Sequence, residues 1–378
     1  PYLFVGSLVA VLVMCLLPNA GSFGMAVSTA MIFGLVSLMF LDTSINMAMQ
    51  PFKMMVGDMV NEKQKGLAYS IQSFLCNAGS LVGFLFPFIF TWIGISNIAP
   101  QGVVPDSVIY SFYIGAAILI LCVIYTTVKV KEMPPAEYAE YHGITEEEEK
   151  EKINMVKLLV KAPKAFWTVG LVQFFCWFAF MFMWTYTNGS VAANVFDAPT
   201  VETAVNGVSK VMLDTKSIQY QDAADWVGVL FAVQAIGSVL WAVCIPLFKD
   251  RKLIYSLSLV LGGLGFISTY FVHNQYVLFI SFLLIGCAWA AMLALPFTIL
   301  TNALSGGHMG TYLGLFNGTI CIPQIVAASL GGSILALFTP KGMLPPEINM
   351  LVMAGVMLII GAVCVYLIKE TKGEQTKA

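Results

Sequence analysis

The sequence of 378 residues contains little charge. Asp, Glu, Lys and Arg together make up 11% of it, whereas apolar residues make up 58% and the mean hydropathy is +0.83. Soluble domains carry roughly 25% charged residues, so a chain with so few could not cover its surface in water. The composition therefore indicates a membrane protein surrounded by a lipid bilayer. The net charge of −2 gives no reason to expect nucleic acid as a partner.

Groups that carry catalysis or bind metals are also scarce. The chain has three histidines, and its eight cysteines lie singly in apolar stretches without a C-x-x-C pair. This usage indicates neither a zinc site nor a disulfide framework, and buried, inert thiols are expected. A membrane-embedded enzyme usually needs paired acids, a metal cluster or an activated nucleophile, and the sequence shows none of them. We expect no enzyme activity, no catalytic residue, no metal and no cofactor.

Long apolar segments, in contrast, are abundant. A helix needs about 20 mostly apolar residues to cross the hydrocarbon core. Ten segments meet this condition, and they predict an all-α membrane protein with helices near 2–20, 25–51, 66–93, 107–129, 164–188, 224–247, 252–272, 275–303, 309–338 and 348–368.

Lysines give these helices a direction. They concentrate in every second loop, at 53–65, 129–164 and 249–252, and in the tail at 369–377. Because positively charged loops stay in the cytoplasm, both ends of this chain are predicted to be cytoplasmic. We expect a multi-pass protein of the cell (inner) membrane.

The chain divides at its longest hydrophilic segment. Residues 131–163 predict a cytoplasmic linker between an N-terminal half, 1–130, and a C-terminal half, 164–378. The end of this linker, "INMVKLLVKAP", is typical of a short helix on the membrane surface. Two such halves joined by a long linker are typical of transporters that rock one half against the other.

A weak internal repeat supports the two halves. Pro51-Phe52 matches Pro296-Phe297, and with one residue of slip Asp58 falls on Asn302. The C-terminal half has two helices before the one that starts at Lys252, and the N-terminal half has no counterpart of them. We therefore expect two further helices upstream, so that ten of an inferred twelve, helices 3–12, are present.

A polar stripe interrupts the second apolar segment. At 100° per residue, Asp42, Asn46 and Lys53 share one helix face with Gln50 at its edge. A charge at the bilayer centre costs about 2.5–3.5 kcal/mol, and Asp42 is the only carboxylate well inside a predicted span. A carboxylate shielded from water holds a proton more tightly, so Asp42 is a candidate for proton coupling. The alternative is a permanently protonated residue that packs two helices.

The neighbouring charges have simpler readings. Lys53 is close enough to the cytoplasmic surface to extend its amine into the headgroups, or it pairs with Asp42 or a sugar hydroxyl. Asp58 opens the predicted cytoplasmic turn, where a helix cap is the alternative to a functional role.

The C-terminal half offers softer candidates. Gln173, Trp177 and Trp184 share one helix face, and aromatic faces with a few hydrogen-bonding groups suit sugar rings; packing or an interfacial belt is the alternative. Asn317 and Gln324 share a face beside Pro323. Small residues permit close helix packing in membranes, and this role is expected for the glycines Gly79, Gly83, Gly314 and Gly318.

The residues Leu41, Asp42, Asn46, Pro51, Lys53 and Asp58, with "LPFTILTNAL" and "MGTYLGLFN…IPQIVAASLGG", resemble the sucrose transporter branch of the major facilitator superfamily, a neighbour of the glycoside–pentoside–hexuronide:cation symporters. The resemblance implies a monomeric proton-coupled symporter that moves a disaccharide, sucrose- or maltose-like, or another glycoside into the cell. Sodium coupling, another sugar or hexuronide, and a sensor that does not transport stay open.

The resemblance also assigns expected roles. Asp42 matches the family's proton- and sugar-binding carboxylate. The other expected substrate-binding residues are Asn46, Gln50, Lys53, Gln173, Trp177, Asn317 and Gln324. Structural or gating roles are expected for Asp58, Pro51, Pro296 and Asn302.

Overall fold

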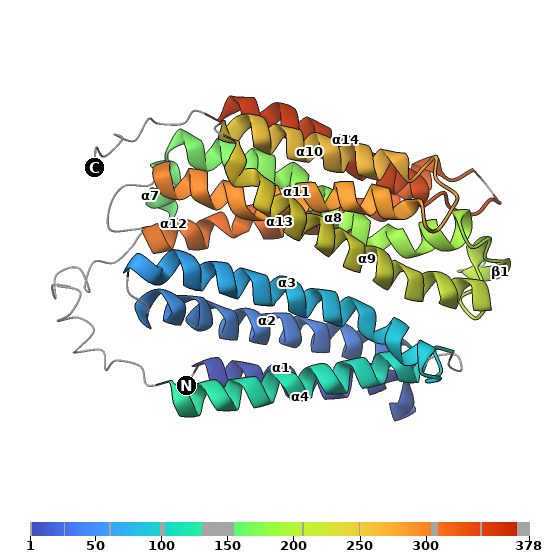
Figure 1. The fold of residues 1–378 in the computed structure, drawn as a ribbon. Coiled ribbons are helices and arrows are strands. Elements are labelled where there is room, and N and C mark those ends of the chain that lie inside the picture. Colours follow the sequence, from blue (N-terminus) through green and yellow to red (C-terminus); the bar gives the residue numbers. More distant parts are fainter. Residues whose placement is uncertain are drawn as a thin grey trace. The chain divides into compact units, whose positions relative to one another are not determined.

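The computed structural model describes residues 2–25, 27–59, 62–98, 103–130, 155–205, 208–248, 250–303, 309–340 and 342–368. The chain forms two compact units, Pro1–Lys152 and Ile153–Ala378, both built mainly from long helices (Figure 1). The predicted linker is outside the described residues up to position 154.

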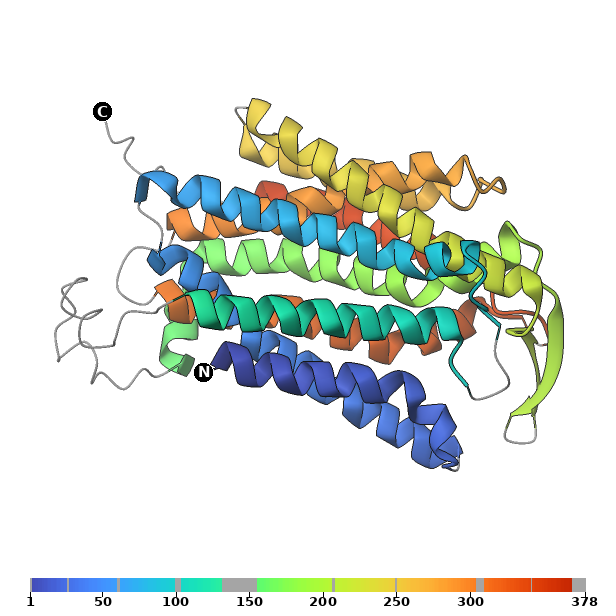
Figure 2. The ribbon, with the colours of Figure 1, turned by 60° about the horizontal axis from the view of Figure 1, so that its bottom comes forward.

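The described residues of the N-terminal unit form four long helices and one short 3-10 helix. These are α1 Tyr2–Leu16, η1 Leu17–Phe23, α2 Val27–Met59, α3 Glu62–Trp92 and α4 Asp106–Lys129. Helix α1 packs against both α2 and α4, and the two views show α4 beside α1 (Figures 1 and 2). The Asn19 amide links these elements, because it donates to the Tyr113 hydroxyl of α4 at 2.7 Å.

The contact between α1 and α2 depends on a glycine. A Cβ at Gly6 would lie 3.0 Å from the Ser44 carbonyl oxygen and 3.2 Å from the Ala48 Cβ. Ser44 and Ala48 are buried in this contact. The two helices therefore approach closely, as small residues allow in membranes.

The described residues of the C-terminal unit form further helices and one hairpin. Its elements are α7 Met155–Val160, α8 Lys164–Asn194, β1 Thr200–Val205, β2 Val208–Leu213, α9 Ile218–Cys244, η2 Ile245–Leu247, α10 Arg251–Ser268, α11 Leu278–Ala303, α12 Met309–Phe316, α13 Gly318–Phe338, α14 Ile348–Cys364 and η3 Val365–Leu367. The strands pair antiparallel, with Thr200 opposite Leu213. They extend beyond the ends of α8 and α9 (Figure 2). This end of the unit, where α14 also begins, is called the hairpin end.

Capping side chains fix where two of these helices begin. The Asp250 carboxylate accepts from the amides of Lys252 and Leu253 at 2.9 and 3.1 Å, ahead of α10. The Ser217 hydroxyl accepts from the Tyr220 amide at 3.3 Å, ahead of α9. Both side chains satisfy backbone N–H groups that a helix start leaves without partners.

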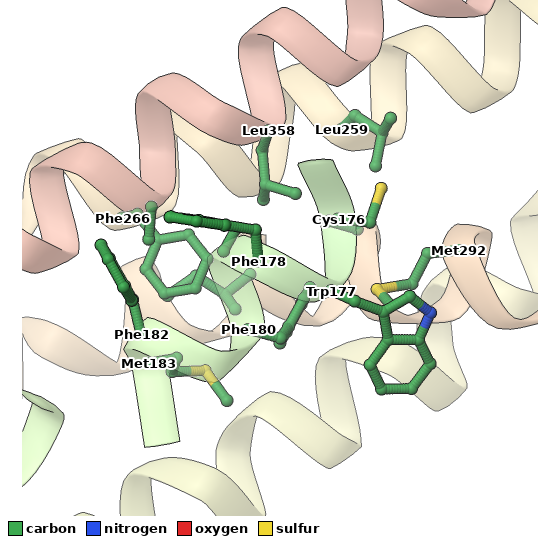
Figure 3. Packing of buried hydrophobic residues seen from close by; sticks show 14 of the residues in the cluster. Cys176, Trp177, Phe178, Phe180, Phe182, Met183, Leu259, Phe266, Met292 and Leu358 are labelled. Atoms are coloured by element: carbon green, nitrogen blue, oxygen red, sulfur yellow. The ribbon is translucent and has the colours of Figure 1, made fainter. Parts of the chain in front are cut away.

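Helix α8 lies at the centre of the C-terminal unit. It contacts α9, α11, α13 and α14, and its phenyl rings form much of the core. Phe178, Phe180 and Phe182 meet Phe266 of α10 and Leu358 of α14 (Figure 3). The neighbouring aromatic rings meet at tilted or edge-on angles, which suit the charge distribution of aromatic faces.

Each predicted span corresponds to helical structure. Among the described residues, nine helices are long and apolar enough to cross a membrane, and Ala78–Trp92 is a shorter apolar helix. The expected all-α architecture is therefore confirmed, and a short helix, α7, occupies the end of the predicted linker.

Three details differ from the sequence prediction. The predicted span 309–338 is divided at Asn317 into α12 and α13. Helix α9 begins at Ile218 rather than 224, so that Asp225 lies in its second turn. The loop after α8 contains the hairpin, whereas the sequence prediction contained helices alone.

Candidate functional site

Asp42 lies in α2, within a candidate span of 22 residues, Ser28–Met49. The Asn46 side-chain amide donates to the Asp42 carboxylate Oδ1 at 3.2 Å and to the Asp42 carbonyl oxygen at 2.9 Å. The spacing of four residues places the two side chains one helical turn apart. The amide and the carboxylate of the predicted stripe are thus in direct contact.

This pair faces away from the packed side of α2. Ser44 and Ala48 contact α1, and Asp42 and Asn46 each precede one of them by two residues, or about 160° around the helix. The Asp42 side chain is exposed, and Asn46 is partly exposed. Polar atoms therefore lie on the side of α2 that the N-terminal unit leaves uncovered.

The rest of the predicted stripe continues along α2. The helix runs to Met59, eight residues beyond the predicted end, so Gln50, Pro51, Lys53 and Asp58 all belong to it. Asp58 is consequently a residue of the last turn of α2, and the expected turn at this position is wrong. The side chains of these four residues are outside the described set.

The repeat partners occupy a matching place in the C-terminal unit. Asn302 is the residue before the last of α11, as Asp58 is in α2. Pro296 lies inside α11 and is buried, whereas the Asn302 side chain is outside the described set. Both members of the repeat thus end a long helix.

Gln173 joins α8 to α11. Its side chain is 1% exposed, and its Nε2 donates to the Met292 carbonyl oxygen at 2.8 Å. Its Oε1 is buried without a hydrogen-bond partner in the described structure, as is the indole Nε1 of Trp177, one turn further along α8. Buried polar atoms without partners are uncommon and costly, so these two atoms stand out among the described residues.

Three tryptophans gather beside these atoms. The ring centroid of Trp289, from α11, lies 5.8 Å from Trp177 and 5.9 Å from Trp184, both of α8, at nearly perpendicular angles. Trp177 is 8% exposed and Trp184 is 41% exposed. Trp177 lies beside Met292 (Figure 3) and belongs to the same buried cluster as the phenyl rings of α8. This trio, the indole cluster, runs from the interior to an exposed surface.

The indole cluster could be predicted only in part. Trp177 and Trp184 share a face of α8 as expected, but Trp289 sits in the apolar run "GCAWAAMLA" and carries no sequence signal of its own. Aromatic faces beside hydrogen-bonding atoms can bind a ring with apolar faces and polar edges. The indole cluster has this composition.

Asn317 and Gln324 lie elsewhere in the unit. Asn317 is exposed at the junction of α12 and α13 and makes no side-chain cap. Gln324 is partly buried, next to Pro323 inside α13. No hydrogen bond between described residues links either side chain to Gln173 or Trp177.

The structure also bears on metals. Within the described ranges, no group of three or more His, Cys, Asp or Glu side chains could hold a metal ion.

Comparisons with known proteins bear on the fold and on part of the chain. Residues 191–378 match the model of the Major Facilitator Superfamily. Comparison with curated proteins gives no match.

Similar solved structures include a D-xylose–proton symporter, with a TM-score of 0.67, 13% identity, and coverage of 98% of this chain and 82% of that one. The xylose transporter XylE from E. coli, in its inward open conformation, has a TM-score of 0.62 and 12% identity, and the match covers 99% of this chain and 80% of that one. The nucleoside transporter NupG has a TM-score of 0.59 and 12% identity, and the match covers 97% of this chain and 87% of that one. At these identities the likeness concerns the fold. The chain therefore has the fold of the major facilitator superfamily, and its residues 191–378 match that family.

Proposed function

We propose that the protein is a secondary active transporter that brings a disaccharide or another glycoside, sucrose- or maltose-like, into the cell together with a proton. The observation that carries this proposal is the Asp42–Asn46 pair inside the span Ser28–Met49. A carboxylate at this depth costs several kcal/mol when charged. A protein retains such a group where its charge has a function.

Proton exchange is the function proposed for Asp42. When the carboxylate is ionised, both of its oxygens accept hydrogen bonds; when it is protonated, one becomes a donor. The Asn46 amide can serve either form, because it offers both a donor and an acceptor. The pair thus supports a carboxylate that gains and loses a proton while its neighbour stays in place.

Sugar recognition is proposed for both units. In the C-terminal unit, the indole cluster offers aromatic faces, and Gln173 Oε1 and Trp177 Nε1 offer one acceptor and one donor. In the N-terminal unit, Asp42, Asn46, Gln50 and Lys53 lie along one helix and are proposed to bind hydroxyl groups. Asn317 and Gln324 are proposed as further polar contacts.

Two similar structures are named as xylose transporters, and one of these is named a proton symporter. This agrees with the proposal, although a nucleoside transporter shares the fold. We place the protein in the inner membrane as a monomer, with both ends of the chain in the cytoplasm.

The test is uptake of labelled sucrose and maltose by proteoliposomes that contain the full-length protein. We expect accumulation against a concentration gradient only when a proton gradient is directed inward. Accumulation that follows a sodium gradient instead would overturn proton coupling. No uptake of either sugar under any gradient would overturn the glycoside proposal.

A further inference from the structure

A second carboxylate lies at the hairpin end of the C-terminal unit. Glu347 follows Pro345 and Pro346 and directly precedes α14. A Cβ placed on Gly189, near the end of α8, would overlap the Glu347 carboxylate. The glycine therefore makes room for the carboxylate against the α8 backbone, where α8 and α14 meet.

The Glu347 carboxylate is short of polar partners. It forms no cap on its own helix, and no hydrogen bond or ion pair to it occurs among the described residues. The titratable groups that face it are the phenols of Tyr186, from α8, and Tyr220, from α9. Lys341, on the loop before α14, is outside the described residues. Neither phenol is a cation that would hold the carboxylate in its charged form.

Burial sets the acidity of this group. It raises the pKa of Glu347 from 4.5 to about 7, because the charged form loses its hydration while the neutral form loses little. Since the packing on Gly189 causes the burial, the pKa depends on the α8–α14 contact itself.

A small hollow lies close to this contact. A hollow at the hairpin end is lined by Ser190 and Asn194 of α8, Thr269 after α10 and Ile348 of α14. Ser190 and Ile348 directly follow Gly189 and Glu347 in the sequence. A titratable side chain, His273, is near the hollow, because its Nδ1 lies 3.2 Å from the carbonyl oxygen of the lining residue Asn194.

We propose that Glu347 is a second proton-binding residue, separate from Asp42, whose neutral form holds α14 against α8 and whose charged form weakens that contact. The reaction is the loss of the carboxylic proton to water and its return, so that no other reactant is needed. The site does not require the proposed sugar transport, because it rests on residues of the C-terminal unit alone.

The direction of the pH effect follows from the raised pKa. The folded protein holds the proton up to about pH 7, whereas an unfolded chain releases it near pH 4.5. The stabilisation by Glu347 is therefore complete below about pH 4.5 and is lost as the pH rises to about 7. The melting temperature of the full-length protein in detergent should fall over this interval, by on the order of 5 °C from this group.

Three variants test the proposal. Glu347→Gln should abolish the part of the fall in melting temperature that Glu347 causes. The variant should then have a higher melting temperature than the wild type above pH 7 and the same melting temperature near pH 4.5. Gly189→Ala should push the carboxylate toward water and move its midpoint toward 4.5. Asp222→Asn, which removes an exposed carboxylate of α9, is the matched control and should keep the wild-type pH dependence.

A direct measurement complements the melting curves. The infrared difference spectrum between the wild type and Glu347→Gln contains the carboxylic C=O band of Glu347. This band should disappear as the pH rises, with a midpoint near pH 7. A midpoint near 4.5, or a Glu347→Gln variant that melts with the wild-type pH dependence, would overturn the proposal. Neither experiment uses sugar or a gradient, so its failure is distinguishable from a failure of the proposed symport.

Discussion

Small and polar residues take part in helix packing to different extents in the two units. In the C-terminal unit, Gly263 of α10 and Gly355 of α14 face each other so closely that a Cβ on either would lie 2.8 or 2.6 Å from the other's carbonyl oxygen. In the N-terminal unit, a Cβ on Gly79 or Gly83 would meet no described atom within 4 Å, and among the described glycines of this unit only Gly6 makes a comparable contact. Most described glycines of the C-terminal unit are needed for packing, whereas most of those of the N-terminal unit are not.

Polar side chains show the same difference. In the C-terminal unit, Gln173 and Ser256 are buried and donate across helix contacts, to the carbonyl oxygens of Met292 and Ala362 at 2.8 and 3.1 Å. In the N-terminal unit, Asn46 donates only within α2, to the exposed Asp42. Apolar attraction does not hold helices together in lipid, so close contacts and cross-helix hydrogen bonds fix the C-terminal unit. The uncovered polar pair of the N-terminal unit is available for another purpose.

The largest expected effect is functional and belongs to the N-terminal unit. Asp42→Asn should reduce sugar accumulation to equal concentrations on the two sides of the membrane, because the amide cannot titrate, while exchange of sugar between the two sides remains. The melting temperature should change little, since the Asp42 side chain is exposed. The measurement is uptake into proteoliposomes with and without an inward proton gradient.

Asp106→Asn is the control for Asp42→Asn. It removes an exposed carboxylate from the first turn of α4 and should leave accumulation intact. Accumulation by the Asp42→Asn protein at the wild-type level would show that the coupling role is wrong.

The next effect is structural and belongs to the C-terminal unit. A Cβ on Gly286 of α11 would overlap the Gln234 carbonyl oxygen and lie 2.7 Å from the Ser238 amide of α9. Gly286→Ala should therefore cost about 1–3 kcal/mol of stability through overpacking, seen as a lower melting temperature. Gly79→Ala should leave the melting temperature unchanged or raise it slightly, because alanine favours a helix. Equal losses in both variants would remove the difference between the units.

The smallest expected effect concerns sugar affinity. Trp184→Ala removes the exposed edge of the indole cluster and should weaken binding about tenfold, or about 1.4 kcal/mol, within the range of an aromatic contact. The control is Trp92→Ala, since Trp92 is 80% exposed at the end of α3. Titration calorimetry with the transported sugar measures both. Unchanged affinity in Trp184→Ala would exclude the indole cluster from the sugar site.

The sequence predicted the helices well because long apolar segments report directly on the lipid around them. It was weaker where a feature depends on a partner helix. Gly79, Gly83 and Gly314 were expected to pack closely, yet no described atom lies within 4 Å of a Cβ on any of them. The expectation fails because a small residue permits a contact but does not supply the facing surface.

Other omissions have local causes. Alternating residues around Asn206-Gly207, a pair that favours tight hairpin turns, indicate a hairpin, but the sequence prediction assigned helices alone. The pairing of Trp289 with Trp177 and that of Glu347 with Gly189 join distant parts of the chain. Neither pairing leaves a trace in the spacing of residues.

The indole cluster also has an optical consequence. With ring centroids 5.8 to 6.4 Å apart, the three side chains exchange excitation faster than they emit, so they behave as one coupled chromophore. Their transitions meet at fixed angles, which gives a paired signal in near-ultraviolet circular dichroism. A sugar bound against Trp184, as proposed, would therefore alter the fluorescence of all three, and occupancy of that site could be followed without an attached dye.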